Sequence, residues 1–251
     1  MNAIRAMLYR EGRIRATNLV FIFWDLFYPL AYMLVFGVGV NAALGSPLSS
    51  AHLDYNSFFL GSVLAMASFG IASNTSWSFF LDRDNGIFFE MLTYPLSRSA
   101  YMLGKVLFTI LVSIMQATIT VALGRLLFHI RIRWELLPLV FAAMFAGTAG
   151  WFFFYSIFAL STRRNDVFNS VTSILYFVFL FASSMFYPLE PLPRWFRVAA
   201  TANPITWQID FLRYATVGLG NAHRVAQESL LFLAFSIAAF LYAVRCLRGQ
   251  E

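Results

Sequence analysis

The chain reads DRDNGIFFEMLTYPLSR from residue 82 to residue 98, and this stretch separates two long apolar runs. Its charges and its proline do not suit a hydrocarbon environment, where every backbone polar group must be paired inside the protein. Its apolar residues are too many for a solvated loop, and they are Phe88, Phe89, Met91, Leu92 and Leu96. We therefore expect a loop over residues 81–104 that docks on a partner protein.

The composition outside this loop is that of an integral membrane protein. Hydrophobic residues make up 60% of the chain and charged residues 12%, whereas soluble domains carry about 25% charged residues. Apolar runs of 18 residues or more recur along residues 1–251, so we expect one all-α transmembrane domain with its first span retained. The single cysteine, Cys246, permits no internal disulfide.

Six spans are predicted from apolar runs of about 20 residues each. They lie near residues 20–41, 57–80, 105–128, 136–160, 168–187 and 228–246. Eleven of the 18 Lys and Arg residues flank the side that holds both termini, which favours cytoplasmic termini in a bacterial inner membrane. The basic stretch from Arg125 to Arg133 runs against this orientation.

Two segments outside the spans have patterns of their own. Residues 1–16 mix arginines with apolar positions at helical spacing, which predicts an interfacial helix with its arginines near lipid headgroups. An ordinary basic flank of the first span would give the same pattern. Residues 188–225 carry four prolines among apolar residues, which predicts short helices re-entering the membrane from outside. A surface loop with aromatic anchors is the alternative.

Polar and aromatic residues inside the predicted spans have ordinary structural explanations. Ser, Thr, Asn and Gln side chains there are expected to form interhelical hydrogen bonds worth about 0.6 kcal/mol each. The 29 phenylalanines, in runs such as Phe79-Phe80 and Phe152-Phe153-Phe154, are expected mainly to face lipid.

Two motifs together resemble the membrane subunits of type-2 ABC exporters, the permeases for drugs, lipid-linked polysaccharides and teichoic acids. The first motif is Gly86-x-x-x-Glu90-x-Leu92-x-x-Pro95-Leu96-Ser97-Arg98 with Gly104-Lys105, similar to the loop that couples such subunits to an ATPase. The second is Asn203-Pro204-Ile205-Thr206 followed by Arg213-Tyr214, similar to the Asn-Pro motif before the last span. The resemblance covers essentially the whole chain.

The resemblance implies a half-transporter that pairs with a second copy of itself or a related permease and with two cytoplasmic ABC ATPase subunits. ATP and Mg²⁺ would bind to those ATPases, because this sequence has no Gly-x-x-x-x-Gly-Lys-Ser/Thr loop and no cofactor motif. The first, second and fifth spans would surround the path of an amphiphilic or lipid-linked substrate moving outward. Membrane lipid is a further expected partner, and nucleic acid is not.

The resemblance also assigns roles to particular residues. Coupling to the ATPase would involve Gly86, Phe88, Phe89, Glu90, Leu92, Pro95 and Arg98, with the apolar side chains, Met91 included, as anchors and the two charges fixing orientation. Asn203, Pro204 and Arg213 would form a gate at the outer end of the path. Asn203 is expected to pair backbone groups that the turn at Pro204 leaves free.

Asp25 is a carboxylate inside the first apolar run. Burial of such a group costs roughly 2.5–3.5 kcal/mol, so we expect it to be hydrated and paired with an arginine of the N-terminal helix, with substrate or proton handling as the alternative. Two other classes of function stay open. An ion-coupled secondary transporter would rely on Asp25, and an intramembrane enzyme would need a convergent acid, base or nucleophile. The histidines, His52, His129 and His223, have no metal-ligand spacing.

Overall fold

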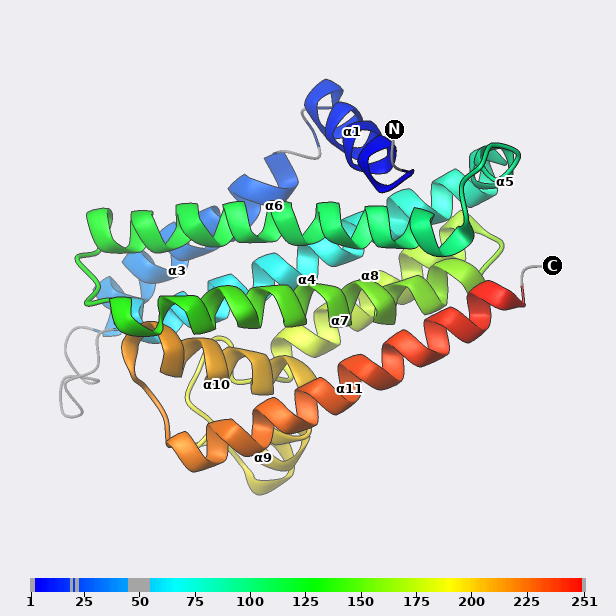
Figure 1. Cartoon of the computed structure of the whole chain (residues 1–251). Helices are drawn as coiled ribbons and strands as arrows, with labels where there is room; N and C mark the ends of the chain where they lie inside the picture. The colour runs from blue at the N-terminus through cyan, green and yellow to red at the C-terminus, as the bar shows by residue number, and fades with distance from the viewer. Residues whose placement is uncertain (1–2, 19, 21–22, 45–54, 250–251) are drawn as a thin grey trace.

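The structure, a computed structural model, describes residues 3–18, 20, 23–44 and 55–249. The regular elements among these residues are all helical, and Figure 1 shows them as an elongated bundle. In chain order they are α1 (Ala3–Thr17), η1 (Phe23–Phe27, a π-helical turn), α3 (Tyr28–Leu44), α4 (Tyr55–Asp84), α5 (Ile87–Met91), α6 (Arg98–Leu127), η3 (Trp134–Leu136), α7 (Leu137–Ser161), α8 (Asn165–Phe181), α9 (Arg194–Thr201), α10 (Pro204–Val217) and α11 (Ala222–Arg248).

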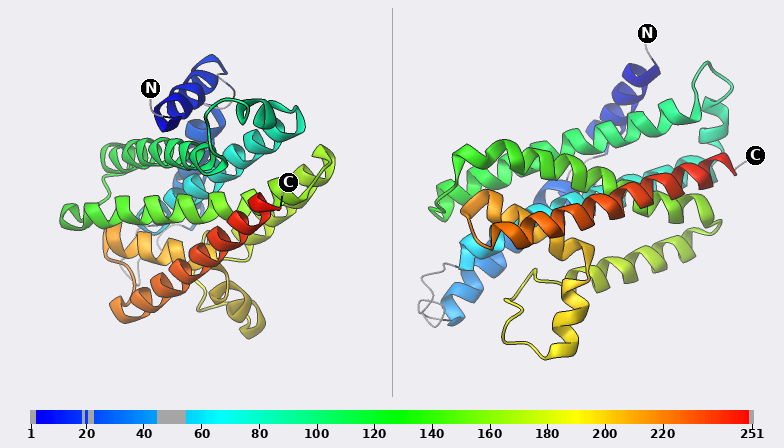
Figure 2. Two further views of the ribbon diagram at one scale, coloured as in Figure 1. Left: turned by 45° about the vertical axis from the view of Figure 1, so that its right-hand side comes forward. Right: turned by 60° about the horizontal axis from the view of Figure 1, so that its bottom comes forward.

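Helix α4 forms the centre of the bundle, and α3, α6, α7 and α10 pack around it. Helix α11 lies on α7 and α10, and α1 lies across α6 outside the bundle (Figures 1 and 2). One end of the bundle holds α5, the α7–α8 turn and the C-terminus of α11, and we name it the α5 end. The opposite end holds the α6–α7 and α10–α11 turns, and we name it the far end.

Six helices overlie the six predicted spans, but they differ in length. Four of them, α4, α6, α7 and α11, are long and apolar enough to cross a membrane. The helices in the first and fifth predicted spans are shorter, at Phe23–Gly39 and Asn165–Phe181. Helix α8 stops before the predicted end at residue 187, because the side-chain amide of Asn203 takes up the carbonyls of Phe179 and Ala182 there.

The loop expected over residues 81–104 is shorter than predicted, because both flanking helices continue through it. Helix α4 runs to Asp84 and α6 begins at Arg98, where the Ser97 hydroxyl caps the helix by accepting from the Ala100 amide at 3.2 Å. The connection therefore covers residues 85–97 and contains α5.

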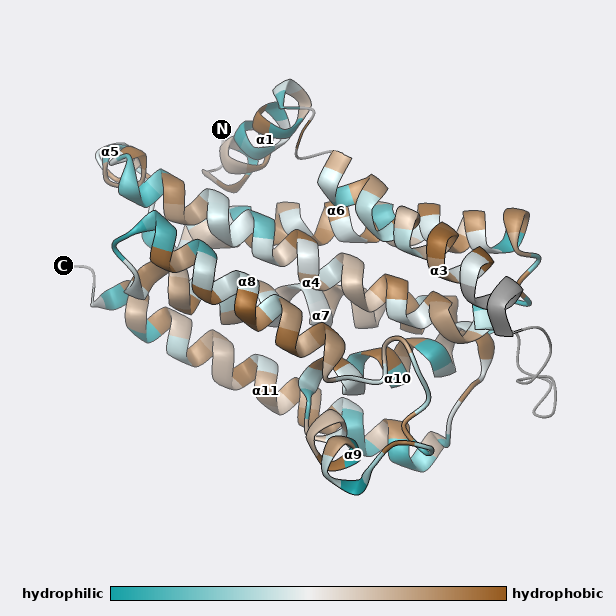
Figure 3. Ribbon diagram, turned by 180° about the vertical axis from the view of Figure 1, so that it is seen from behind, coloured by the Kyte–Doolittle hydropathy of each residue, from teal (hydrophilic) through white to brown (hydrophobic). Residues whose placement is uncertain are grey.

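The expectation that the phenylalanine runs mainly face lipid was wrong for several of them. Phe59, Phe79, Phe80 and Phe152 are fully buried between helices. The expected interhelical hydrogen bonds are present, for example from Thr148 to Ser113 at 2.7 Å. Figure 3 shows hydrophobic residues along the long helices and hydrophilic residues toward both ends of the bundle.

The segment predicted to re-enter the membrane forms two short helices, α9 and α10, rather than a loop. Helix α10 buries Ile205, Ile209 and Leu212 against the bundle. Helix α9 leaves Trp195 largely exposed (72%). A turn at Asn203 separates the two helices, as the proline that follows requires.

Candidate functional site

Helix α5 is fixed to the bundle through Phe88. Gly86 adopts a left-handed conformation (φ 76°) that turns the chain sharply after α4, and α5 begins at the next residue. The Phe88 ring is fully buried and meets the rings of Phe79 and Tyr101 edge-on, at centroid distances of 5.7 and 5.0 Å. Phe88 therefore holds α5 to its own subunit, and it does not lie on the exposed surface where we predicted an anchor.

The outer face of this connection presents a mixed aromatic and acidic surface. Phe89 is 47% exposed, Tyr94 is 67% exposed, and Glu90 and Pro95 are exposed beside them. Leu92 is half-buried against the core. We name Phe89, Glu90, Tyr94 and Pro95 the α5 surface. Of the residues predicted to couple to an ATPase, this surface includes Phe89, Glu90 and Pro95.

Arg98 is not brought to Glu90. Its Nη1 donates to the carbonyl oxygen of Leu247 near the end of α11, at 3.4 Å. A second arginine, Arg83, donates through Nη1 to the carbonyl of Leu160 at 2.6 Å and through Nη2 to that of Thr162. The two arginines thus tie the base of α5 to the helix ends around it.

A buried charge cluster lies beneath α5, where α1, α4 and α6 meet. The Lys105 ammonium group has no exposure and lies 3.1 Å from Glu11 Oε1 and 3.0 Å from Asp82 Oδ2. Arg10 pairs with the same carboxylates, at 2.8 Å from Glu11 and 2.7 Å from Asp82. Tyr101 donates its hydroxyl to Asp82. Two cations and two anions therefore balance.

The pairing has a consequence for Arg10, which lies on α1. Burial works against the charged form of its guanidinium, but the hydrogen bond and charge of Asp82, with the charge of Glu11, raise the pKa of Arg10 above its usual value. The N-terminal helix thus differs from the prediction, because Arg10 and Arg15 turn to the protein while Arg5 and Arg13 stay exposed.

Asp25 is paired with Arg15, as one of the two readings of the sequence expects. Arg15 Nη1 donates to Asp25 Oδ2, and the Asn74 amide donates to Oδ1 at 2.9 Å. Arg15 also donates to the Thr75 hydroxyl at 2.9 Å. Asp25 is only 3% exposed, because η1 turns it toward α4, and it borders a cavity beside α4 and α8.

The predicted gate residues cluster around α10. Asn203 caps α10 by accepting from the Ile205 amide at 3.2 Å, and its own amide donates to the last carbonyls of α8, at 2.7 and 2.9 Å. Pro204 occupies the first turn, where no amide hydrogen is needed. Arg213 is buried and donates to the Phe58 carbonyl at 2.9 Å and the Ser184 carbonyl at 2.6 Å. These bonds join α10 to α4 and to the segment after α8.

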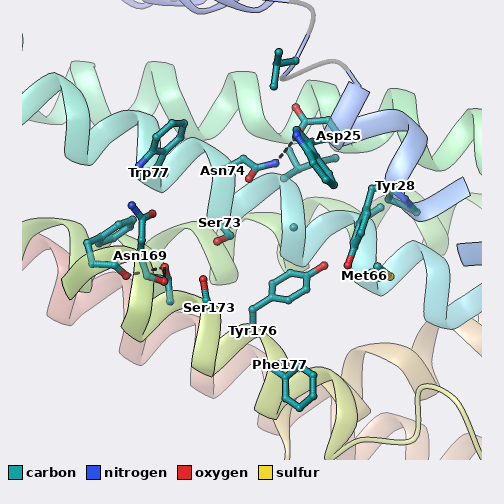
Figure 4. Close-up of a pocket in the computed structure, with 18 of the residues that line it drawn as sticks. Asp25, Tyr28, Met66, Ser73, Asn74, Trp77, Asn169, Ser173, Tyr176 and Phe177 are labelled. Carbon is teal, nitrogen blue, oxygen red and sulfur yellow. Dashed lines mark hydrogen bonds between the residues drawn. The ribbon is translucent and has the colours of Figure 1, made fainter. Parts of the chain in front are cut away.

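A cavity of about 890 Å³ lies between η1, α3, α4 and α8 (Figure 4). Polar groups from α4 and α8 line part of it, from Ser73, Asn74, Asn169 and Ser173, and the rings of Tyr28, Tyr176 and Phe177 line another part. Trp24 and Phe177 are also exposed on the outside of the subunit, so the cavity reaches the surface.

Comparison with known protein families decides the classification. Residues 2–217 match the family model described as ABC-2 type transporter. The chain belongs to this family. The ABC-2 family match covers every helix from α1 to α10. The chain is therefore a membrane subunit of a transporter, and its long apolar helices agree with that.

The individual relatives that we compared are 24 to 28% identical to this chain. The chain is 24% identical over 223 residues to a protein of Pyropia yezoensis named as a transport permease, ycf38, covering 82% of this chain and 74% of the relative. It is 25% identical over 187 residues to the protein of the same name from Cyanophora paradoxa, covering 74% and 64%. It is 28% identical over 159 residues to a protein of Escherichia coli K12 named as a multidrug ABC transporter permease, YbhR, covering 61% of this chain and 42% of the relative.

The sequence reading of this ABC-2 subunit missed the charge cluster beneath α5. In the sequence analysis, residue 82 is the start of the quoted loop, Lys105 is part of its motif, and Glu11 has no assigned role. The available signal was their position at the edges of apolar runs, where a charge needs a partner. The ion pairs join positions 23 residues apart (Asp82 and Lys105), 72 apart (Arg10 and Asp82) and 94 apart (Glu11 and Lys105), which periodicity does not reveal.

Proposed function

We propose that this chain is the membrane subunit of an ATP-driven exporter whose ATP hydrolysis takes place in separate cytoplasmic ATPase chains. The observation that carries the proposal is the α5 surface, where the exposed ring of Phe89 and the Glu90 carboxylate lie on a short helix whose base is locked into the bundle, and the exposed ring of Tyr94 follows that helix. Exposed aromatic residues beside a charge are typical anchors at protein interfaces. Since Phe88, Arg83 and Arg98 fix the base, a partner that moves the α5 surface also moves the helices beneath it.

The cavity of Figure 4 supports the proposed path. It is lined by the helices of the first, second and fifth predicted spans, and it combines polar groups with aromatic rings. This lining suits an amphiphilic or lipid-linked substrate, which presents both a polar group and an apolar tail. In a dimer, the exposed rings of Phe23, Trp24 and Phe27 would meet a second copy or a related permease and close the cavity.

The α9–α10 segment is the proposed outer gate. It lies toward the far end, with Asn203 binding α8 and Arg213 binding α4, so that the path helices are joined there. In this proposal the α5 end is cytoplasmic, both termini are on that side, and the membrane is the bacterial inner membrane.

Ion-coupled transport is less well supported. It would rely on Asp25, but Arg15 and Asn74 hold this carboxylate as a paired anion inside the protein. A group that must bind and release an ion is poorly served by a permanent cationic partner.

The test is truncation of the α5 surface in the purified complex with the ATPase. Phe89→Ala and Glu90→Ala should each weaken ATPase retention by about 5- to 30-fold, as expected for interface anchors worth 1–2 kcal/mol, and should lower ATP-dependent transport. The matched controls are Phe145→Ala, an exposed ring on α7, and Glu135→Ala, an exposed carboxylate at the far end. Full ATPase retention by both α5 variants would refute the proposal.

A further inference from the structure

A second cavity, of about 400 Å³, lies at the far end between α10, α11 and the segment after α8. Its volume is within the range of small-ligand pockets. Five ionisable side chains line it, and they are Glu190, Asp210, Arg213, Arg224 and Glu228. Three carboxylates face two guanidinium groups, so the cavity has one negative charge in excess. None of these groups belongs to the α5 surface or to the cavity of Figure 4.

Arg213 is fully occupied by protein acceptors, and Arg224 is occupied in part. Every N–H group of Arg213 is engaged, with Nε on the Phe58 carbonyl, Nη1 on Ser184 and Asp210, and Nη2 on Ser62 and the carbonyls of Ser184 and Met185. Arg224 donates Nε to Glu228 Oε1 at 2.8 Å. An anion would meet three carboxylates here, and of the two arginines only Arg224, whose side chain is 51% exposed, has Nη groups left to bind it.

Two carboxylate oxygens on either side of Arg224 are not satisfied in this way. Glu228 Oε2 is buried and has no hydrogen-bond partner, and the Glu228 side chain is only 8% exposed. Asp210 Oδ1 accepts from Ser184 at 3.1 Å and Arg213 at 3.2 Å, whereas Oδ2 lies 3.8 Å from Arg224, beyond hydrogen-bond distance. A buried carboxylate oxygen without a donor is costly, so this geometry calls for a donor with positive charge.

We infer that this cavity binds the primary ammonium group of an amphiphile, with Glu228 and Asp210 as its acceptors. An ammonium group offers three N–H donors and one positive charge, which matches the free oxygens and the excess charge. Leu189, Leu219 and Val225 line the cavity beside them and would contact an apolar tail. A divalent metal fits less well, because no three His, Cys, Asp or Glu residues in the described part of the chain are grouped to hold one.

An ammonium group could come from a phospholipid headgroup or from a free alkylamine, and the test has an arm for each. In the first arm, native mass spectrometry of the full chain compares bound phosphatidylethanolamine with phosphatidylcholine, whose quaternary nitrogen cannot donate a hydrogen bond. In the second arm, the Tm of the detergent-solubilised chain is compared in octylammonium and octyltrimethylammonium. If the chain binds phosphatidylethanolamine in preference to phosphatidylcholine, the ammonium group comes from a lipid headgroup. If octylammonium raises the Tm, octyltrimethylammonium does not, and the chain shows no preference between the two lipids, the ligand is a free alkylamine.

Glu228→Gln should abolish whichever preference the wild type shows, because it removes the charge and keeps an oxygen for Arg224. We expect a loss of about ten-fold, the size of one charge-assisted hydrogen bond. Glu190→Gln, at an exposed lining position, should lower binding less, and Glu135→Gln is the matched control with the same change in net charge. If Glu228→Gln fails to fold, Asp210→Asn takes its place. Absence of any ammonium preference in the wild type, equal binding by Glu228→Gln, or stronger retention of phosphatidylglycerol would overturn the inference.

Discussion

Lys105 has no contact with solvent, and its ammonium group lies between the carboxylates of Glu11 and Asp82. A buried ion pair contributes little net stability when it is compared with apolar packing, but removing one partner leaves an uncompensated charge. The cluster therefore acts mainly on specificity. It permits α1 to dock on α6 in one register only, because Glu11 and Arg10 must both reach their partners.

Removing this charge should destabilise the subunit. Lys105→Met leaves two buried carboxylates with Arg10 as their only nearby cation, at an expected cost of about 3–5 kcal/mol. The free energy of unfolding in detergent measures the effect. Arg13→Met, an exposed arginine on the same N-terminal helix, is the control and should change stability by less than about 0.5 kcal/mol.

Charge balance gives a further check on the same cluster. Adding Asp82→Asn to Lys105→Met restores neutrality, so the double variant should recover part of the lost stability. Additive losses in the double variant, or an unchanged Lys105→Met, would contradict the view that balance governs this cluster.

At the scale of elements, α1 and α6 approach each other at Gly104. A Cβ atom at this position would overlap the Met7 side chain, so the two helices are in contact only because residue 104 is glycine. Gly104 was quoted in the sequence motif, but the sequence alone does not show that Met7 packs against it.

Gly104→Val should therefore displace α1 from α6. We expect faster proteolytic cleavage of the segment after α1 and a lower Tm, since the cluster around Lys105 would open with it. Gly39→Val serves as the control, because a Cβ at Gly39 meets no atom within 4 Å. Equal protease resistance of the two variants would argue against this contact as the docking point.

Asn203 joins two elements, because its oxygen caps α10 while its amide donates to the carbonyls that end α8. Asn203→Asp keeps the cap but leaves those carbonyls without a donor, so it should lower the free energy of unfolding by about 1–3 kcal/mol.

Asn221 provides the matched control. It caps α11 through its oxygen alone among the bonds described, so Asn221→Asp should be nearly neutral. If Asn203→Asp and Asn221→Asp lowered the free energy of unfolding equally, the Asn203 amide would not stabilise the contact between α8 and α10.

For the whole molecule, the helical class and the places of its six main helices were predictable, because hydrophobic runs report burial or lipid contact directly. The short helices around Asn203 were predictable because proline and asparagine act locally. The inward turn of Phe88 was not, since Phe88 and Phe89 are adjacent and equally apolar. Which ring faces the core depends on Phe79 and Tyr101, which come from two other helices.

Two of the three arginines in the basic stretch at the far end, Arg125 and Arg133, have partners there, and Arg131 is exposed. Arg133 lies 3.8 Å from Glu135 and over the Tyr214 ring, and Arg125 donates to the Ile130 carbonyl at 3.5 Å. The far end thus keeps its positive charge, which runs against the predicted orientation.

The orientation itself is testable with two exposed positions at opposite ends. In a Cys246→Ser background, Arg131→Cys should react with an impermeant thiol reagent added to intact cells, and Tyr94→Cys only after permeabilisation. The reverse pattern would place the α5 surface outside and end the proposed coupling to a cytoplasmic ATPase.

Helix α4 is one unbroken rod of 30 residues, about 45 Å long. Asp82 binds it to the charge cluster near the α5 end, and Phe58 and Ser62 bind it to Arg213 near the far end. Close to its midpoint, Ser68 accepts from Gln208, whose oxygen is held by Trp151. A stiff rod that is bound at both ends and near its middle moves as one body. In the proposed exporter, a displacement at the α5 end would therefore reach the contacts of Arg213 at the far end through α4 itself.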